Sequence, residues 1–201
     1  MFPLFHHVVA AFATAIFAAA LLALPARAVD TASDPAGDAA LAEAARMDAL
    51  FDDLAAPEGD LWIRAESDIL RAWTQSGSAM IDTLTRRGEG ALDLGDPESA
   101  IGHLNAAIDH GPDFAQAYYL RGAAFYMSAH FGEAAADLAT ALRLEPRHFL
   151  ALTQLGTMLY DMGNQEAALA AFNASLDIHP HQREALDAVE QIESRTGARA
   201  I

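Results

Sequence analysis

The 201-residue sequence contains no cysteine, which excludes disulfides, thiol chemistry and cysteine-based metal sites. It also contains no lysine, so all 12 of its basic side chains are arginines, against 28 acidic residues. The resulting formal charge of −16 opposes binding to nucleic acids and to anionic lipids, whose phosphates would be repelled. The same charge is compatible with a basic partner, although much of it serves only to keep the chain in solution.

Sequence motifs of common active sites are missing as well. No glycine-rich phosphate loop, nucleophile elbow or strand-like alternation is present. His110, His148, His179 and His181 lie near predicted turns, which packed helices would space roughly 10 Å apart, too far for shared metal ligands. We therefore expect no enzymatic activity, no metal and no cofactor, and we expect these histidines to be solvated.

The N-terminus has the features of a targeting segment. Residues 8–24 form an uncharged apolar run, Pro25 interrupts it, and residues 26–28 fit a small-residue cleavage motif. We predict a signal peptide over residues 1–28 that contacts the membrane only during export. The alternative is an uncleaved membrane anchor, but the apolar run is short for a helix that spans a bilayer. The alanine-rich, lysine-free composition favours a bacterial source, and hence a periplasmic or secreted protein. Residues 29–37 predict a disordered lead.

The rest of the sequence repeats itself every 34 residues. Gly88, Gly122 and Gly156 are separated by this step, and three further columns keep the same register. These columns are Ala100, Ala134 and Ala168; Ala107, Ala141 and Ser175; and Pro112, Pro146 and Pro180. A fixed period of this length indicates stacked helix pairs. In each pair, we expect another helix to pass too close to the glycine for a Cβ, and we expect the proline to end the second helix.

The columns carry a resemblance to a known family. The second copy resembles the tetratricopeptide repeat through residues 117–122 and then Phe125, Ala134, Leu138, Ala141 and Pro146. The resemblance implies an all-α fold, an α-solenoid of stacked antiparallel helix pairs with a C-terminal capping helix. We place three repeats over residues 81–182, the capping helix over 183–195 and a degenerate N-terminal helix pair over 38–77.

The resemblance also implies a binding groove lined by the first helix of each repeat. The residues that would contact a partner are Tyr119, Tyr126, Met127, Thr153, Thr157, Tyr160, Glu89, Asp93 and Asp161. Such a groove has an aromatic centre with acids on both sides. It lacks the lysines and asparagines with which members of the family grip C-terminal carboxylates. Alternatively, Tyr119, Tyr126 and Tyr160 serve only to pack one repeat against the next.

These features favour an exported, non-enzymatic scaffold that binds a protein or peptide partner in the periplasm. An accessory or chaperone subunit of an exported enzyme, or of an envelope assembly complex, is an alternative. An enzyme with its site in the N-terminal pair or in the groove is a third possibility.

One pair of charges is expected inside the second repeat. Arg121 stands where the family more often has leucine, and Asp137 follows sixteen residues later on the second helix. The third copy has Leu155 and Ala171 at the matching positions. We predict an ion pair between Arg121 and Asp137 that joins the two helices of the second repeat.

Overall fold

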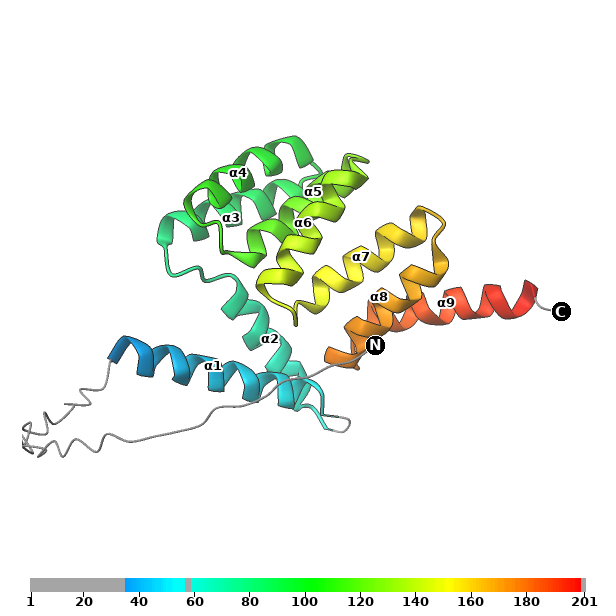
Figure 1. Cartoon of the computed structure of the whole chain (residues 1–201), viewed down its shortest axis with the longest axis horizontal. Helices are drawn as coiled ribbons and strands as arrows, with labels where there is room; N and C mark the ends of the chain where they lie inside the picture. The colour runs from blue at the N-terminus through cyan, green and yellow to red at the C-terminus, as the bar shows by residue number, and fades with distance from the viewer. Residues whose placement is uncertain (1–34, 57–58, 200–201) are drawn as a thin grey trace, which may run out of the picture.

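The computed structural model of the protein describes residues 35–56 and 59–199, and its regular secondary structure over these residues is entirely helical (Figure 1). The all-α fold predicted from the sequence is confirmed. The predicted signal peptide lies outside the described residues. The helices are α1 (Pro35–Leu54), α2 (Leu61–Trp73), α3 (Ala79–Asp93), α4 (Pro97–His110), α5 (Ala115–Met127), α6 (Phe131–Leu144), α7 (Phe149–Asp161), α8 (Gln165–Ile178) and α9 (Arg183–Arg199).

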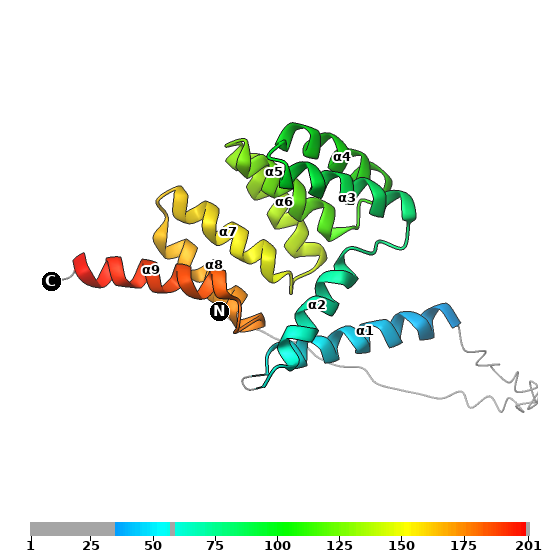
Figure 2. The same cartoon turned by 180° about the vertical axis from the view of Figure 1, so that it is seen from behind.

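Six of these helices form three stacked pairs. Helices α3 and α4, α5 and α6, and α7 and α8 pack as hairpins, each pair stacks on the next, and α9 packs on α8 (Figures 1 and 2). The first helices of the pairs also contact one another in the order α3, α5, α7, α9. These four helices therefore share one side of the stack, which we call the groove face.

The repeated glycines lie where the two helices of a pair come closest. A Cβ added to Gly88 would lie 2.6 Å from Cγ of Leu104, and one added to Gly156 would lie 2.8 Å from the ring of Phe172. At Gly122 the corresponding distance to Cγ of Leu138 is 3.1 Å. The prediction that another helix passes close to these glycines is confirmed, and that helix is the second one of the same pair. The column that fills this space, Leu104, Leu138 and Phe172, has the same 34-residue step.

The turns inside the repeats use a left-handed residue. Gly95 and Gly163 have φ values of 72° and 82°, and the equivalent position in the second repeat is Ala129, with φ 58°. Helix α6 begins at Phe131, directly after this turn, so Gly132 belongs to the helix. An alanine in this conformation costs roughly 1 kcal/mol relative to glycine, because its Cβ crowds the backbone.

Two boundaries differ from those expected from the sequence. Helix α1 begins at Pro35, so the last residues of the lead predicted over residues 29–37 are helical. Proline is well tolerated in the first turn of a helix, where its missing N–H leaves no bond unmade. The predicted capping helix continues past residue 195 to Arg199.

The N-terminal pair, predicted as a degenerate repeat, does not extend the stack beside α3. Its apolar side chains form a cluster with Phe149 at the start of α7, whereas the core shared by α3, α4 and α5 contains no residue of α1 or α2. The members from the pair are Phe51, Leu54, Ala65, Ile69 and Trp73. We call α1 and α2 together the N-terminal hairpin, and it covers the turns that lead into α7 and α9.

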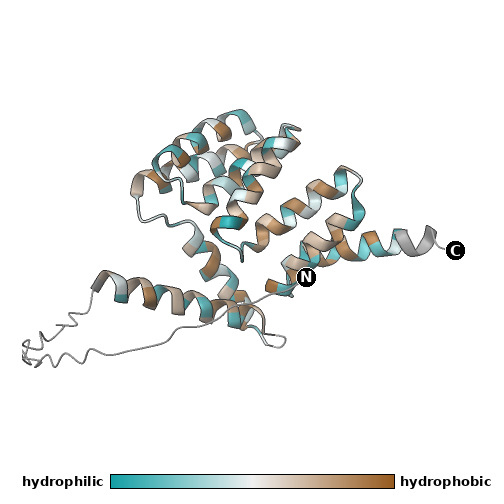
Figure 3. Ribbon diagram, viewed as in Figure 1, coloured by the Kyte–Doolittle hydropathy of each residue, from teal (hydrophilic) through white to brown (hydrophobic). Residues whose placement is uncertain are grey.

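Apolar and polar residues are mixed along the helices, as amphipathic helices that bury one side require (Figure 3). Among the described residues, no helix combines the length and the hydropathy needed to span a bilayer.

The ion pair predicted inside the second repeat is present. Nε and Nη2 of Arg121 each donate to a carboxylate oxygen of Asp137 at 2.7 Å, and Nη1 donates to Oδ1 of Asn105 on α4, also at 2.7 Å. Both charged side chains are largely buried. The bidentate contact raises the pKa of Arg121, chiefly through its hydrogen bonds to Asp137. Arg121 thereby joins three successive helices, α4, α5 and α6.

We predict that Asp137→Ala destabilises the protein by about 2–4 kcal/mol, because it leaves the Arg121 guanidinium without its carboxylate in a mostly buried position. The double variant Arg121→Leu with Asp137→Ala recreates the apolar pair of the third repeat and should be more stable than the single variant. Urea unfolding followed by circular dichroism measures both. A double variant no more stable than Asp137→Ala would contradict this account of the pair.

Candidate functional site

The predicted partner-binding residues lie on the helices that form the groove face. Helix α3 carries Glu89 and Asp93, and the other members of the set lie on α5 and α7. Those on α5 are Tyr119, Tyr126 and Met127, and those on α7 are Thr153, Thr157, Tyr160 and Asp161. The structure divides them among two cavities, a contact between repeats, the interior and, for Met127, the exposed end of α5.

A cavity of about 330 Å³ lies in the middle of the groove face. Glu89 and Asp93 of α3 form one wall, Tyr119 of α5 and Leu150 of α7 contribute apolar surface, and Leu70 of α2 borders it from the N-terminal hairpin. We call it the central cavity. The sequence did not indicate that α2 reaches this groove, because its register is unrelated to that of the repeats.

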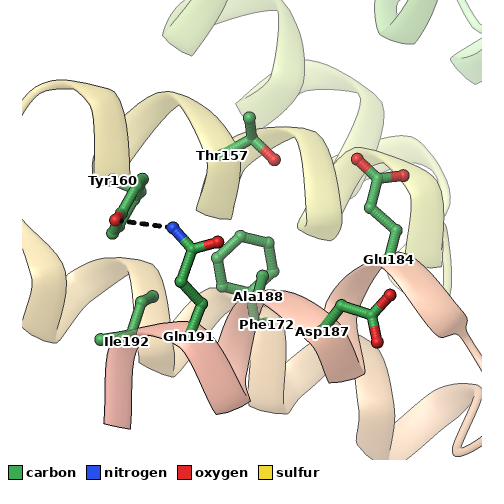
Figure 4. A pocket seen from close by; sticks show the side chains of 8 residues that line it. All are labelled: Thr157, Tyr160, Phe172, Glu184, Asp187, Ala188, Gln191 and Ile192. Atoms are coloured by element: carbon green, nitrogen blue, oxygen red, sulfur yellow. Dashed lines mark hydrogen bonds between the residues drawn. The ribbon is translucent and has the colours of Figure 1, made fainter. Parts of the chain in front are cut away.

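A second cavity of about 290 Å³ lies between α7 and α9, and we call it the C-terminal cavity (Figure 4). Tyr160 stands at one end, the carboxylates of Glu184 and Asp187 stand at the other, and the ring of Phe172 lies between them. Nε2 of Gln191 donates to the Tyr160 hydroxyl at 3.0 Å. Sequence reasoning missed the α9 residues, because it treated that helix only as a cap.

One carboxylate from each cavity acts on the hydroxyl of Tyr119. Burial, together with the smaller effects of the charges of Glu184 and Glu89, raises the pKa of its hydroxyl to about 12. These two carboxylates belong to α9 and α3, which are the outer helices of the groove face. They therefore act on one hydroxyl from helices at opposite ends of the face, and that hydroxyl stays protonated at neutral pH.

Three of the predicted side chains already form hydrogen bonds within the protein, namely those of Tyr126, Asp161 and Thr153. The Tyr126 hydroxyl donates a hydrogen bond to Asp161, which joins the second repeat to the third and raises the pKa of Tyr126 to about 12. Thr153 is only 2 % exposed and donates to Oε1 of Gln182 at 2.8 Å. Thr153 is therefore not accessible to a partner in this structure, whereas Thr157 and Tyr160 line the C-terminal cavity.

The alternative in which the tyrosines pack between repeats also has support. Tyr119 lies against the ring of His148, with centroids 4.8 Å apart, and the Tyr160 hydroxyl accepts from Gln191 and from Arg195 on α9. Each of the three tyrosines nevertheless keeps part of its side chain accessible. Tyr119 and Tyr160 therefore both pack against neighbouring helices and line a cavity, whereas Tyr126 lines neither cavity and bonds to Asp161.

Two histidines that were expected to be solvated are buried instead. His148 is 0 % and His179 is 1 % exposed, because the N-terminal hairpin covers the turns on which they lie. The ring of Trp73 stacks on His148 with centroids 4.1 Å apart, and that of Trp62 stacks on His181 at 4.7 Å. In the part of the chain that the structure describes, no group of three or more histidines and acids is placed to hold a metal ion.

The contacts of His148 require an uncharged ring. The backbone N–H of Ala151 donates to Nδ1 at 3.2 Å, so Nδ1 carries no proton, and Nε2–H donates to Oε1 of Gln116 at 3.1 Å. Burial lowers the pKa of His148 to about 4. Burial also lowers the pKa of His179, although the nearby carboxylate of Glu66, 3.4 Å away, partly opposes the shift.

We predict that the free energy of unfolding falls by about 2 kcal/mol between pH 7.5 and pH 5. In this window the unfolded chain protonates His148, whose free pKa is about 6.5, while the folded protein does not, so acid favours unfolding. The stability is complete above about pH 6.5 and declines as the pH falls toward about 4. Urea titrations at several pH values, followed by the fluorescence of Trp73 and Trp62, measure this.

Two variants separate His148 from other titrating groups. His148→Asn keeps a side-chain acceptor for the Ala151 N–H but does not titrate, so its stability should depend less on pH. His110→Gln removes an exposed histidine and should retain the wild-type dependence. An unchanged slope in His148→Asn would show that a different group is responsible.

Comparisons with known proteins agree with this architecture. A family model described as tetratricopeptide repeat matches residues 85–129 and 128–183. A TPR repeat-containing protein of Rhizobium etli is 30% identical over 148 residues, which cover 73% of this chain and 72% of that protein.

Two solved structures are also similar. The crystal structure of MamA has a TM-score of 0.55 and 25% identity, and the match covers 79% of this chain and 85% of that one. The first TPR of Spaghetti (RPAP3), bound to the HSP90 peptide SRMEEVD, has a TM-score of 0.57 and 20% identity. That match covers 60% of this chain and 98% of the other, and at this identity it shows a shared fold alone.

Proposed function

Because the chain belongs to the tetratricopeptide repeat family, we propose that it is an exported scaffold that binds a protein or peptide partner on its groove face. The observation that carries this proposal is the central cavity, where apolar surface from Tyr119 and Leu150 lies beside the carboxylates of Glu89 and Asp93. A concave site with an apolar floor and a few polar groups is a common form of ligand site. A protein of the same fold, the first TPR of Spaghetti, binds a peptide, which supports a peptide or protein as the partner.

Blocking the central cavity tests this function. Ala123 lines the cavity from α5 and is partly exposed, so Ala123→Phe should fill the space with little effect on folding. We expect the affinity for the natural partner to fall by at least roughly 1.4 kcal/mol, which is tenfold, because the ring occupies the site of the partner. The partner would be captured from an extract of the source cells, and its affinity measured by calorimetry.

The control is Ala139→Phe, which adds the same ring to an exposed position on α6, outside the groove face. Equal affinities of Ala123→Phe and wild type would place the binding surface elsewhere on the protein. Circular dichroism confirms that both variants are folded.

Export is the second part of the proposal, and it rests on the sequence. The apolar run at residues 8–24 and the small residues at 26–28 favour cleavage before Val29. Mass analysis of the protein from its source cells should then find Val29 as the first residue. Ala28→Asp should leave the precursor uncleaved, because signal peptidases require a small residue there. An intact Met1 in the membrane fraction of wild-type cells would indicate an anchor instead.

A further inference from the structure

The acidic side chains of the groove face fall into two groups. Asp82, Asp161 and Asp187 have partners within the protein, since Asp82 accepts from the Ser76 hydroxyl at 2.6 Å, Asp161 accepts from Tyr126, and Asp187 lies 3.7 Å from Nε of Arg183. The side chains of Glu89, Asp93 and Glu184 form no hydrogen bond or ion pair with any residue that the structure describes. The second group therefore keeps its full capacity to accept hydrogen bonds from a cation.

The unpaired carboxylates lie next to apolar side chains that line the same cavities. The central cavity is lined by Glu89 and by the apolar side chains of Leu92, Leu150 and Tyr119. The C-terminal cavity is lined by Glu184 and by the ring of Phe172. Among the described residues no arginine lines either cavity, although Arg195 contacts Tyr160 at the C-terminal cavity and Arg86 lines a neighbouring cavity together with Glu89. A groove of this kind accommodates a long basic side chain, whose methylene groups lie on apolar surface while its charge reaches a carboxylate.

We propose that the groove binds an extended basic segment of a partner protein, with one arginine or lysine side chain at Glu184 in the C-terminal cavity and another at Glu89 in the central cavity. The aliphatic part of the side chain at Glu89 lies over Leu92 and Leu150. The inference rests on the proposed function, since it names the chemistry of the partner that the groove face receives. The net charge of −16 strengthens the attraction over a longer range and speeds the association.

The sign of the charge argues against an acidic partner. The HSP90 peptide SRMEEVD, bound by the first TPR of Spaghetti, has three acidic residues and one arginine. Such a peptide would bring its carboxylates next to Glu89 and Glu184, and like charges across an interface cost affinity. The shared fold therefore does not imply a shared partner.

Three fluorescein-labelled peptides test the proposal on the mature chain by fluorescence anisotropy. In each peptide leucine alternates with a second residue, which is arginine, glutamate or serine. The arginine peptide should bind, and its affinity should fall as salt is added, because salt screens the attraction between exposed charges. Glu89→Gln and Glu184→Gln should each weaken its binding roughly three- to tenfold, and the double variant should weaken it more.

A matched control is Glu190→Gln, which removes an exposed carboxylate of α9 that lines neither cavity. It should leave the affinity for the arginine peptide within about twofold of wild type, because a distant exposed charge is largely screened. If all three glutamine variants weaken binding equally, the peptide responds only to net charge and the proposal is wrong.

The remaining outcomes distinguish this inference from the proposed function. If the glutamate or the serine peptide binds as tightly as the arginine peptide, and Ala123→Phe abolishes that binding, the groove binds peptides but not by the proposed chemistry. If Ala123→Phe changes the binding of none of the peptides and of no natural partner, the groove function itself fails, and this inference fails with it.

Discussion

The close contact between a glycine on the first helix of each repeat and a large apolar side chain on the second is the constraint on which the stack depends. At Gly88 and Gly156 there is no room for even one methyl group without displacement of Leu104 or Phe172. The contact fixes how near the two helices lie and which side of each first helix faces inward. The opposite side of α3, α5 and α7 is then turned toward the groove. The position of Glu89 or Tyr119 in the groove is in this sense a consequence of the neighbouring glycines.

The N-terminal hairpin imposes a second constraint, and it differs in kind. Its tryptophans cover histidines that lie on the turns before α7 and α9, more than seventy residues away along the chain. A buried histidine with both nitrogens bonded holds its ring in one tautomer, so the packing of the hairpin depends on the protonation state of His148. Leu70 of the same hairpin borders the central cavity, so a change in the packing of the hairpin also changes the wall of that cavity.

The sequence predicted the features that recur within each repeat, and it missed the contacts made by residues outside the repeat pattern. The 34-residue period was sufficient to predict the helix pairs, the role of Gly122 and the contact between Arg121 and Asp137, because each of these is a relation within one repeat. The docking of the N-terminal hairpin on Phe149 involves residues with no common register, so no periodic signal indicates it. Thr153 was assigned to the groove from its position in the repeat alone, but its side chain is buried and donates a hydrogen bond to Gln182. The contribution of Glu184 was missed because it requires knowing how α9 lies against α7.

The same fold binds partners of different chemistry, so the fold alone does not decide the partner of this chain. The helices of a tetratricopeptide stack supply a curved surface, and the residues that protrude from it determine which charges can approach. In this protein the aromatic and aliphatic floor is bordered by Glu89, Asp93 and Glu184, and the chain offers no lysine anywhere to balance them. Each of these carboxylates is hydrated in the free protein, and a partner must replace that hydration with hydrogen bonds of similar strength. A guanidinium or ammonium group meets this requirement, whereas a neutral apolar segment would leave the acids partly desolvated and unpaired.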